Sequence, residues 1–263
     1  MEQVRFKRKT VDLDEMEKQQ SRKRRRRNAF YVFLFLFILI LFLGTAFFLF
    51  FRVKEISVTG NSVYSDEQII QAAGIEMDSN LFSFSGKRVE ETVKSALPYV
   101  GSVTVKRDLP SGVVIEIEEK QAVMYTEING DYYLLSDELY VLSVSNKLSS
   151  VPNSAIKLVT GSVDRCLVGQ PITFMDARTR ESVLEMYSVL QRNEMDYYIR
   201  EIDITSRFDI SMQYTDRFHI YIGDMDNFDL KIPFLEKVID ELYDEDKGSI
   251  DLSSHTEATV ALE

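Results

Sequence analysis

Residue types that could do chemistry are sparse in this chain. It holds two histidines, His219 and His255, and one cysteine, Cys166. His219 stands in a run that alternates apolar and polar residues, as strands do, so we expect a structural or exposed imidazole. The segment Asp224-Met225-Asp226-Asn227 resembles the start of a calcium loop, but Phe228 takes the fifth position and the required Gly and Glu do not follow. The sequence therefore predicts no metal site and no cofactor.

The sequence motifs typical of catalytic sites also give no indication of an enzyme. The motifs GxxxxGK[ST], GxSxG and HExxH do not occur, and each supplies a phosphate cradle, a nucleophile or a metal pair. We expect no peptidoglycan transpeptidase of the SxxK type, no catalytic residue and no small-molecule substrate. An enzyme of the cell wall is the least favoured class, and an assay of the purified protein on peptidoglycan would detect one.

Charge is divided unevenly along the chain. Residues 1–29 carry eleven Lys and Arg against five Asp and Glu, a net charge of +6. The net charge of the whole chain is −11, so residues 30–263 carry a net charge of −17. A strongly acidic domain does not attract nucleic acid by its general field. We therefore expect protein partners and no nucleic acid. Attraction to anionic lipid and a topology signal are sufficient to explain the basic tail.

One apolar run explains the charge division. Residues 29–51 are apolar almost throughout and follow six consecutive basic residues, 22–27. Twenty-three helical residues span about 34 Å, enough for a bilayer core of about 30 Å. A cleaved signal peptide is the alternative, but residues 47–54 offer no small-residue cleavage site. The pattern predicts one transmembrane helix with residues 1–28 in the cytoplasm and the remainder outside.

The first extracytoplasmic segment, residues 52–120, mixes strand and helix patterns. Residues 53–59 and 113–119 alternate as strands, and so does 100–107. Between them, Ser65 begins a capping box for a helix that Gly74 ends, and a second helix covers about 87–97. The order β-α-α-β-β predicts a two-layer α+β sandwich of about 70 residues.

The second segment, residues 121–263, is rich in strands. Strands are predicted at 122–128, 132–135, 139–144, 156–159, 199–204, 209–214 and 218–222, for which antiparallel pairing is the natural interpretation. Helices are predicted at about 176–191 and 227–243. Pro233 should lie in the first two turns of the second helix, which could therefore begin near Lys231. The class is α+β, with a larger antiparallel sheet in this domain.

Several short motifs together resemble a known family. They are Val-Thr-Gly-Asn at 58–61, the helix start at 65–69, Asn80-Leu81-Phe82, Leu97-Pro98-Tyr99-Val100, the run 103–110, and Ile-Glu-Ile-Glu-Glu at 115–119. In this order, after one N-terminal anchor, they resemble the POTRA domain of the bacterial division proteins FtsQ and DivIB. The strand-rich segment resembles the β domain that follows it there. The match departs at Gln121-Ala122, Ser253 and Glu257.

The resemblance implies a role rather than a reaction. It implies a non-enzymatic scaffold of the divisome at the septum, anchored in the cell membrane, that binds partners resembling FtsL and DivIC or FtsB and helps regulate septal peptidoglycan synthesis. The alternative is a POTRA-containing, membrane-anchored chaperone or secretion component. Such proteins usually carry several POTRA repeats or a membrane barrel, and the sequence shows neither pattern.

The partner site is expected at the C-terminal edge of the β domain. A strand that includes Val260 has no later neighbour in sequence, so it should border the sheet and offer unpaired backbone groups to a partner strand. The resemblance also places the partner here. We expect partner-binding residues throughout 253–260, with Thr256 and Val260 foremost, and we expect Thr259→Pro to remove an edge N–H. The predicted set is Ser253, Ser254, Thr256, Glu257, Ala258, Thr259 and Val260.

Overall fold

The computed structural model describes residues 13–263, and their side chains from residue 28 onward. Helix α1, Leu13–Phe50, is the first element, so it begins before the apolar run and passes through the basic cluster. Its apolar part, Asn28–Phe50, is 23 residues long with mean hydropathy 3.0 and contributes no buried residue to the protein. Such a helix is stable when lipid surrounds it. The predicted basic tail lies partly in residues 1–12, outside the described residues.

The first domain, residues 52–120, whose motifs resemble the POTRA domain, follows directly. Its sheet has the order β1-β3-β2, with β1 parallel to β3 and β2 antiparallel to it. Two helices provide the apolar cover, since Ile69 and Val93 are fully buried in the same core as Ile115 of the sheet. The bounds are β1 Glu55–Thr59, α2 Asp66–Ala73, α3 Gly86–Ala96, β2 Val100–Asp108 and β3 Gly112–Glu119.

The ends of α2 show why this segment folds as predicted. The Ser65 side chain accepts the N–H of Gln68, and the Gln68 side chain accepts the N–H of Ser65, which completes the capping box. At the other end Gly74 adopts φ 61°, a left-handed conformation that glycine enters without steric cost. The predicted two-layer α+β sandwich is confirmed.

The second domain is built on a nine-stranded sheet of order β14-β13-β12-β11-β10-β7-β4-β5-β6. A small separate hairpin, β8 with β9, was not predicted. The strands are β4 Met124–Ile128, β5 Asp131–Leu135, β6 Val141–Ser145, β7 Ile156–Thr160, β8 Val163–Arg165, β9 Thr173–Phe174, β10 Ile199–Ser206, β11 Asp209–Tyr214, β12 Phe218–Gly223, β13 Gly248–Asp251 and β14 Thr259–Leu262. The helices are α4 Ala177–Arg192, α5 Phe228–Asp240 and a 3-10 turn at Leu148–Ser150.

The α+β class is confirmed, and the large sheet is mixed rather than wholly antiparallel. Strand β7 runs parallel to both β4 and β10, and β12 runs parallel to β13. The other strand pairs of this sheet are antiparallel. Parallel neighbours require a crossover, and helices α4 and α5 lie in the crossovers from β7 to β10 and from β12 to β13.

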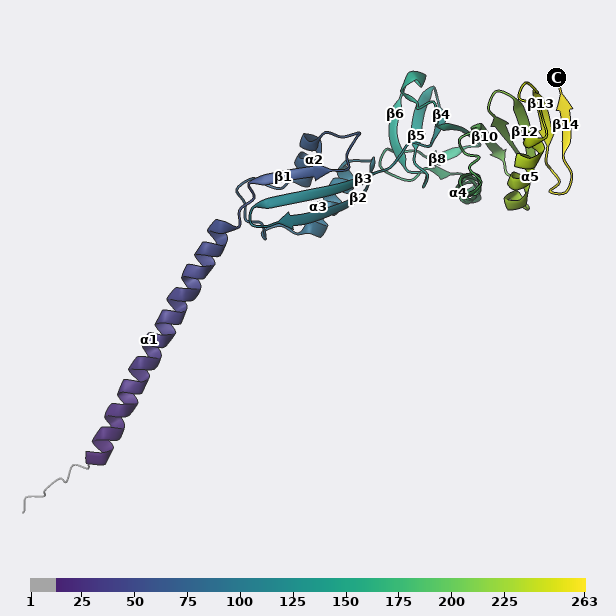
Figure 1. Cartoon of the computed structure of the whole chain (residues 1–263). Coiled ribbons are helices and arrows are strands. Elements are labelled where there is room, and N and C mark those ends of the chain that lie inside the picture. Colours follow the sequence, from purple (N-terminus) through teal and green to yellow (C-terminus); the bar gives the residue numbers. More distant parts are fainter. Residues whose placement is uncertain (1–12) are drawn as a thin grey trace, which may run out of the picture.

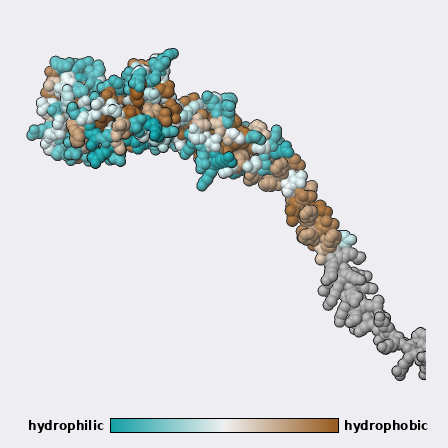
Figure 2. All heavy atoms as spheres, turned by 180° about the vertical axis from the view of Figure 1, so that it is seen from behind, coloured by the Kyte–Doolittle hydropathy of each residue, from teal (hydrophilic) through white to brown (hydrophobic). Residues whose placement is uncertain are grey.

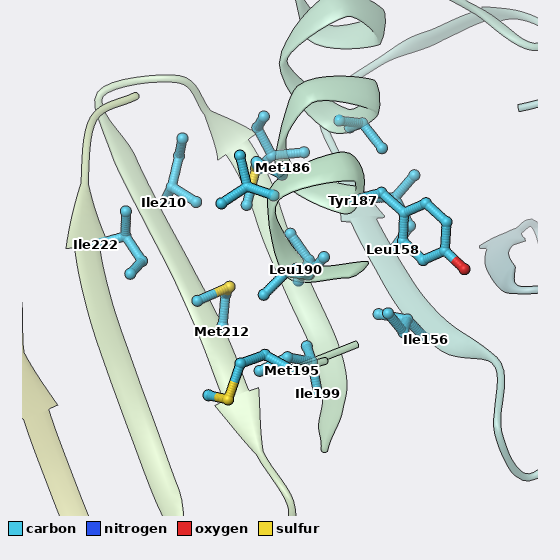
Figure 3. Packing of buried hydrophobic residues seen from close by; sticks show 14 of the residues in the cluster. Ile156, Leu158, Met186, Tyr187, Leu190, Met195, Ile199, Ile210, Met212 and Ile222 are labelled. Atoms are coloured by element: carbon cyan, nitrogen blue, oxygen red, sulfur yellow. The ribbon is translucent and has the colours of Figure 1, made fainter. Parts of the chain in front are cut away.

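Helix α4 covers the middle of this sheet. Figure 3 shows Met186 and Leu190 pointing from α4 toward Ile210 and Met212 of β11. Met186, Leu190 and Ile210 are fully buried and Met212 is nearly so, as expected for an apolar stripe at helical spacing against a sheet. Helix α5 begins at Phe228, close to the predicted start at 227, and Pro233 is its sixth residue, within the first two turns as predicted; the alternative start near Lys231 is wrong.

The parts follow one another in a line. Helix α1 leads into the POTRA domain, the nine-stranded sheet lies beyond it, and β14 stands at the end farthest from the helix (Figure 1). Contacts that join the domains include the Tyr99 hydroxyl, 2.9 Å from the Ser143 hydroxyl, and the Lys120 ammonium, 3.6 Å from both the centre of the Tyr140 ring and the Glu138 carboxylate.

Candidate partner-binding edge

The C-terminal edge of the large sheet consists of three strands over α5. Strand β13 pairs with β12 on one side and with β14 on the other, and β14 ends the sheet. Ile220 of β12 and Ile250 of β13 are fully buried against the core that includes Ile232 and Leu235 of α5. The edge strand is therefore attached to a packed layer, and its prediction as a border strand is confirmed.

Gly248 allows β14 to approach β13. It has φ 150°, and a β-carbon built there would lie 2.0 Å from the carbonyl oxygen of Ala261. A side chain at this position would push β14 off the sheet.

The hydrogen-bond alternation of this strand pair identifies which backbone groups are free. Glu263 donates its N–H to the Lys247 carbonyl at 2.9 Å, and the register then pairs Ala261 with Ser249 and Thr259 with Asp251 as hydrogen-bonded positions. The N–H groups of the alternate residues Val260 and Leu262 therefore point away from β13. Thr259→Pro would remove a bond inside the sheet, so the expectation that it removes an edge N–H is wrong.

Side chains of β14 alternate between the two faces of the sheet. Val260 is opposite the buried Ile250 and is half-buried against the core, and Leu262 follows on the same face with 54% of its surface exposed. Thr259 and Ala261 are exposed on the other face. A partner strand laid along β14 could therefore extend the apolar face beside Val260 and Leu262.

The rest of the predicted set lies in a loop. Ser253, Ser254, Thr256, Glu257 and Ala258 lie in the loop between β13 and β14, so of the expected binding stretch 253–260 only Thr259 and Val260 are on the strand. The Thr256 N–H donates to the Ser254 hydroxyl at 3.2 Å, which holds the chain in a turn. Thr256 is therefore outside the strand on which it was placed beside Val260.

Asp251 closes the start of this loop. Its carboxylate accepts the hydroxyl of Ser253 at 2.7 Å and the N–H of Ser253 at 2.9 Å. These two hydrogen bonds stabilise the charged form and lower the pKa of the Asp251 carboxyl. The loop thus begins with a local polar turn of the kind that competes with strand geometry.

A buried lysine of α5 holds the end of β12, next to the C-terminal edge. Lys231 of α5 is 1% exposed, and its ammonium donates to the carbonyls of Ile222 at 2.8 Å and Asp224 at 3.2 Å. The Asp224 carboxylate lies 3.7 Å away and supplies the opposite charge. Sequence reasoning missed this residue because lysines are seldom fully buried, and its place on the apolar side of an amphipathic helix is the signal that could have identified it.

The sequence does contain one Ser-x-x-Lys motif, the spacing of the peptidoglycan transpeptidases. Ser154-Ala155-Ile156-Lys157 has the Ser-x-x-Lys spacing, although no protein of this type was expected. Lys157 lies on β7, and its ammonium lies 3.0 Å from the Glu201 carboxylate. The hydrogen bond to Glu201 raises the pKa of Lys157, whereas a lysine that serves as a general base needs a lowered pKa. This geometry does not resemble a catalytic site.

Metal ligation finds no support in the part of the chain described. Among residues 28–263, whose side chains the structure describes, no three His, Cys, Asp or Glu side chains are gathered closely enough to hold an ion. His255 of the β13–β14 loop has its ring nitrogen 3.5 Å from the Asn227 amide. A cleft of about 900 Å³ lies between the two domains and includes Lys120, Glu138 and Tyr140 in its wall.

Comparisons with known proteins agree with this architecture. Residues 51–120 match the model of the FtsQ-type POTRA domain. The chain is 29% identical to the cell division protein DivIB of Clostridium tetani over 70% of its length and 68% of that protein. It is 23% identical to DivIB of Clostridium botulinum strain Hall over 78% and 79%, and 25% identical to the cell division protein FtsQ of Corynebacterium glutamicum over 67% and 73%.

Proposed function

Because this chain belongs to the FtsQ/DivIB family of bacterial cell division proteins, we propose that it is a non-enzymatic, membrane-anchored scaffold of the divisome. Its proposed partners resemble FtsL and DivIC or FtsB. Through them it would help regulate septal peptidoglycan synthesis. The proposed parts are a cytoplasmic tail, 1–28, a transmembrane helix, 29–51, the POTRA domain, 52–120, and a β domain, 121–263, that carries the binding edge outside the membrane.

The observation that carries this proposal is the free edge of β14. Edge strands present unpaired N–H and C=O groups, and a partner strand that pairs with them gains main-chain hydrogen bonds without a preformed pocket. The outward N–H groups of Val260 and Leu262 are separated by one residue, which is the spacing of a strand ladder. Of the residues predicted from sequence, Thr259 and Val260 remain in this proposed strand. The loop residues Ser253, Ser254, Thr256, Glu257 and Ala258 flank it.

The decisive experiment replaces Leu262 by proline. This change removes one outward N–H and places a ring at the edge, while the Ala261 and Glu263 hydrogen bonds to β13 remain possible. A lost hydrogen bond contributes about 1 kcal/mol, and the ring also blocks close approach, so we expect affinity to fall about tenfold. Calorimetric titration of the full chain in nanodiscs with the extracytoplasmic segment of the DivIC-type partner measures it.

Leu262→Ala is the matched control. It removes the same side chain but retains the N–H, so we expect the alanine variant to bind more tightly than Leu262→Pro, and the difference reports the outward N–H, while both variants keep the wild-type circular dichroism spectrum. Equal affinity of Leu262→Pro and wild type would show that the partner binds elsewhere. A fluorescent fusion of the wild-type chain should form a band at midcell, and a uniform membrane signal in dividing cells would contradict the septal location.

A further inference from the structure

The junction between α1 and the POTRA domain is rigid and carries an exposed aromatic residue. Leu81 donates its N–H to the Phe51 carbonyl at 2.9 Å, and Val53 donates to the Ser79 carbonyl at 2.9 Å. The Asp78 N–H returns to the Val53 carbonyl at 2.8 Å. These bonds tie the loop between α2 and α3 to the end of the membrane helix, without a flexible linker between them.

The contacts of Phe82 with the rings of Phe47 and Phe51 set the depth of this loop in the membrane. Phe47 lies in the last turn of α1, and its ring stacks on that of Phe82 with 5.2 Å between centroids. The Phe51 ring meets Phe82 edge-on at 5.6 Å. Arg52 and Lys54 follow the apolar span directly, and charged side chains stay outside the hydrocarbon core, so the last turn of the span lies at the interfacial layer. Phe82 is therefore held at the level of that layer.

Phe82 is exposed even though an aromatic ring of this size normally packs inside the protein. It remains 47% exposed beside its neighbours Phe47 and Phe51. Figure 2 shows the hydrophobic surface of α1 running up to the end of the POTRA domain, where this loop lies. Aromatic residues are enriched at this depth because the ring contacts acyl chains while polar groups nearby reach the headgroups.

Arg107, on β2, completes the arrangement. Its guanidinium lies 5.5 Å from the centre of the Phe82 ring and 5.1 Å from that of Phe84. It also donates to the carbonyls of Leu81 at 2.8 Å and Phe84 at 2.9 Å. The loop thus has internal partners for carbonyls that would otherwise need water, as irregular backbone near lipid requires.

We propose that Phe82 inserts into the interfacial layer of the membrane that α1 spans, so that the POTRA domain docks on the lipid surface through its α2–α3 loop. Arg107 holds the loop in the inserting conformation. The occupant is lipid, because the ring lies at the depth of a span that lipid already surrounds. This docking fixes the tilt of the POTRA domain and with it the position of the binding edge.

The absence of tryptophan from the sequence allows a direct test. The full chain with Phe82→Trp is reconstituted in vesicles of phosphatidylethanolamine and phosphatidylglycerol, with and without bromine on the acyl chains. We expect emission at short wavelength and quenching that is stronger for bromine near the headgroup than for bromine near the bilayer centre. Phe208→Trp is the matched control, because Phe208 is 76% exposed in the second domain, and its emission should be unquenched.

Each outcome decides the proposal. Emission and quenching of Phe82→Trp equal to those of Phe208→Trp would show a ring in water and overturn it. Short-wavelength emission without quenching would show that protein covers the ring, and this would overturn it too. Quenching of Phe50→Trp, a residue of the apolar helix, confirms that the chain is inserted in the same vesicles.

Discussion

Single charged side chains hold irregular segments of this protein together. The Glu119 carboxylate accepts the N–H groups of Ser62 and Val63 at 2.9 Å and the Ser62 hydroxyl at 2.7 Å, and so attaches the turn before α2 to the end of β3. Burial raises the pKa of Glu119, but the hydrogen bonds outweigh it and the net pKa is lowered. Lys231 and Arg107 also fix irregular segments, by donating hydrogen bonds to backbone carbonyls. Sequence patterns do not reveal these roles, because charged residues are exposed by default.

Cys166 gives a prediction at the same scale. It follows β8 and packs against the core of the second domain, where burial raises the pKa of its thiol to about 11. The thiolate is the reactive species, so at neutral pH the folded protein should react slowly with maleimide. Between pH 7 and pH 10 we expect the labelling rate to rise about tenfold per pH unit, as long as circular dichroism shows a folded chain.

A matched measurement separates burial from ordinary thiol behaviour. In denaturant the thiol returns to its usual pKa near 9, so the rate should be higher at neutral pH and should level off at about pH 9. A folded protein whose labelling rate already levels off at about pH 9, as in denaturant, would show that Cys166 is accessible to water.

At the scale of the elements, local signals were predicted well and long-range pairing was not. The capping box at Ser65 and the alternation of β3 depend on neighbours in sequence, and both formed as predicted. The parallel pairing of β7 depends on residues dozens of positions away, which the sequence pattern does not encode. Strands as short as β8 and β9 contain too few residues for a periodicity. Thr256 lies in the polar turn before β14 rather than on the strand with Val260, because hydrogen bonds of the Ser254 hydroxyl favour the turn there.

The helix faces of the POTRA domain can be tested by charge. Ile69 of α2 and Val93 of α3 are fully buried, so Ile69→Asp or Val93→Asp would place an unpaired carboxylate in the core. We expect each to destabilise the domain by about 3 kcal/mol or more. Gln71→Asp, an exposed position on α2, should cost about 1 kcal/mol or less. Thermal unfolding of the full chain followed by circular dichroism compares the three, and equal midpoints would refute the face assignment.

The described part of the molecule, residues 13–263, is extended, and this limits what the proposed binding edge can reach. Helix α1 ends at the POTRA domain, and β14 lies at the opposite end of the second domain (Figure 1). A partner that pairs with β14 must therefore itself project away from the membrane. Sequence alone predicted the order of the parts, but the line they form depends on contacts such as Tyr99 with Ser143, which link residues 44 positions apart.

The last prediction concerns the side of the membrane on which the two domains lie. Six consecutive basic residues before the apolar span favour a cytoplasmic N-terminus, and the acidic remainder follows the span to the other side. Cys166 is a poor probe because it is half-buried, so we replace it with serine and introduce Ser254→Cys in the exposed β13–β14 loop or Ser21→Cys before the span. A membrane-impermeant maleimide applied to intact cells with permeable walls should label Ser254→Cys and spare Ser21→Cys. Lysis should expose Ser21→Cys, and the reverse pattern in intact cells would place the binding edge in the cytoplasm.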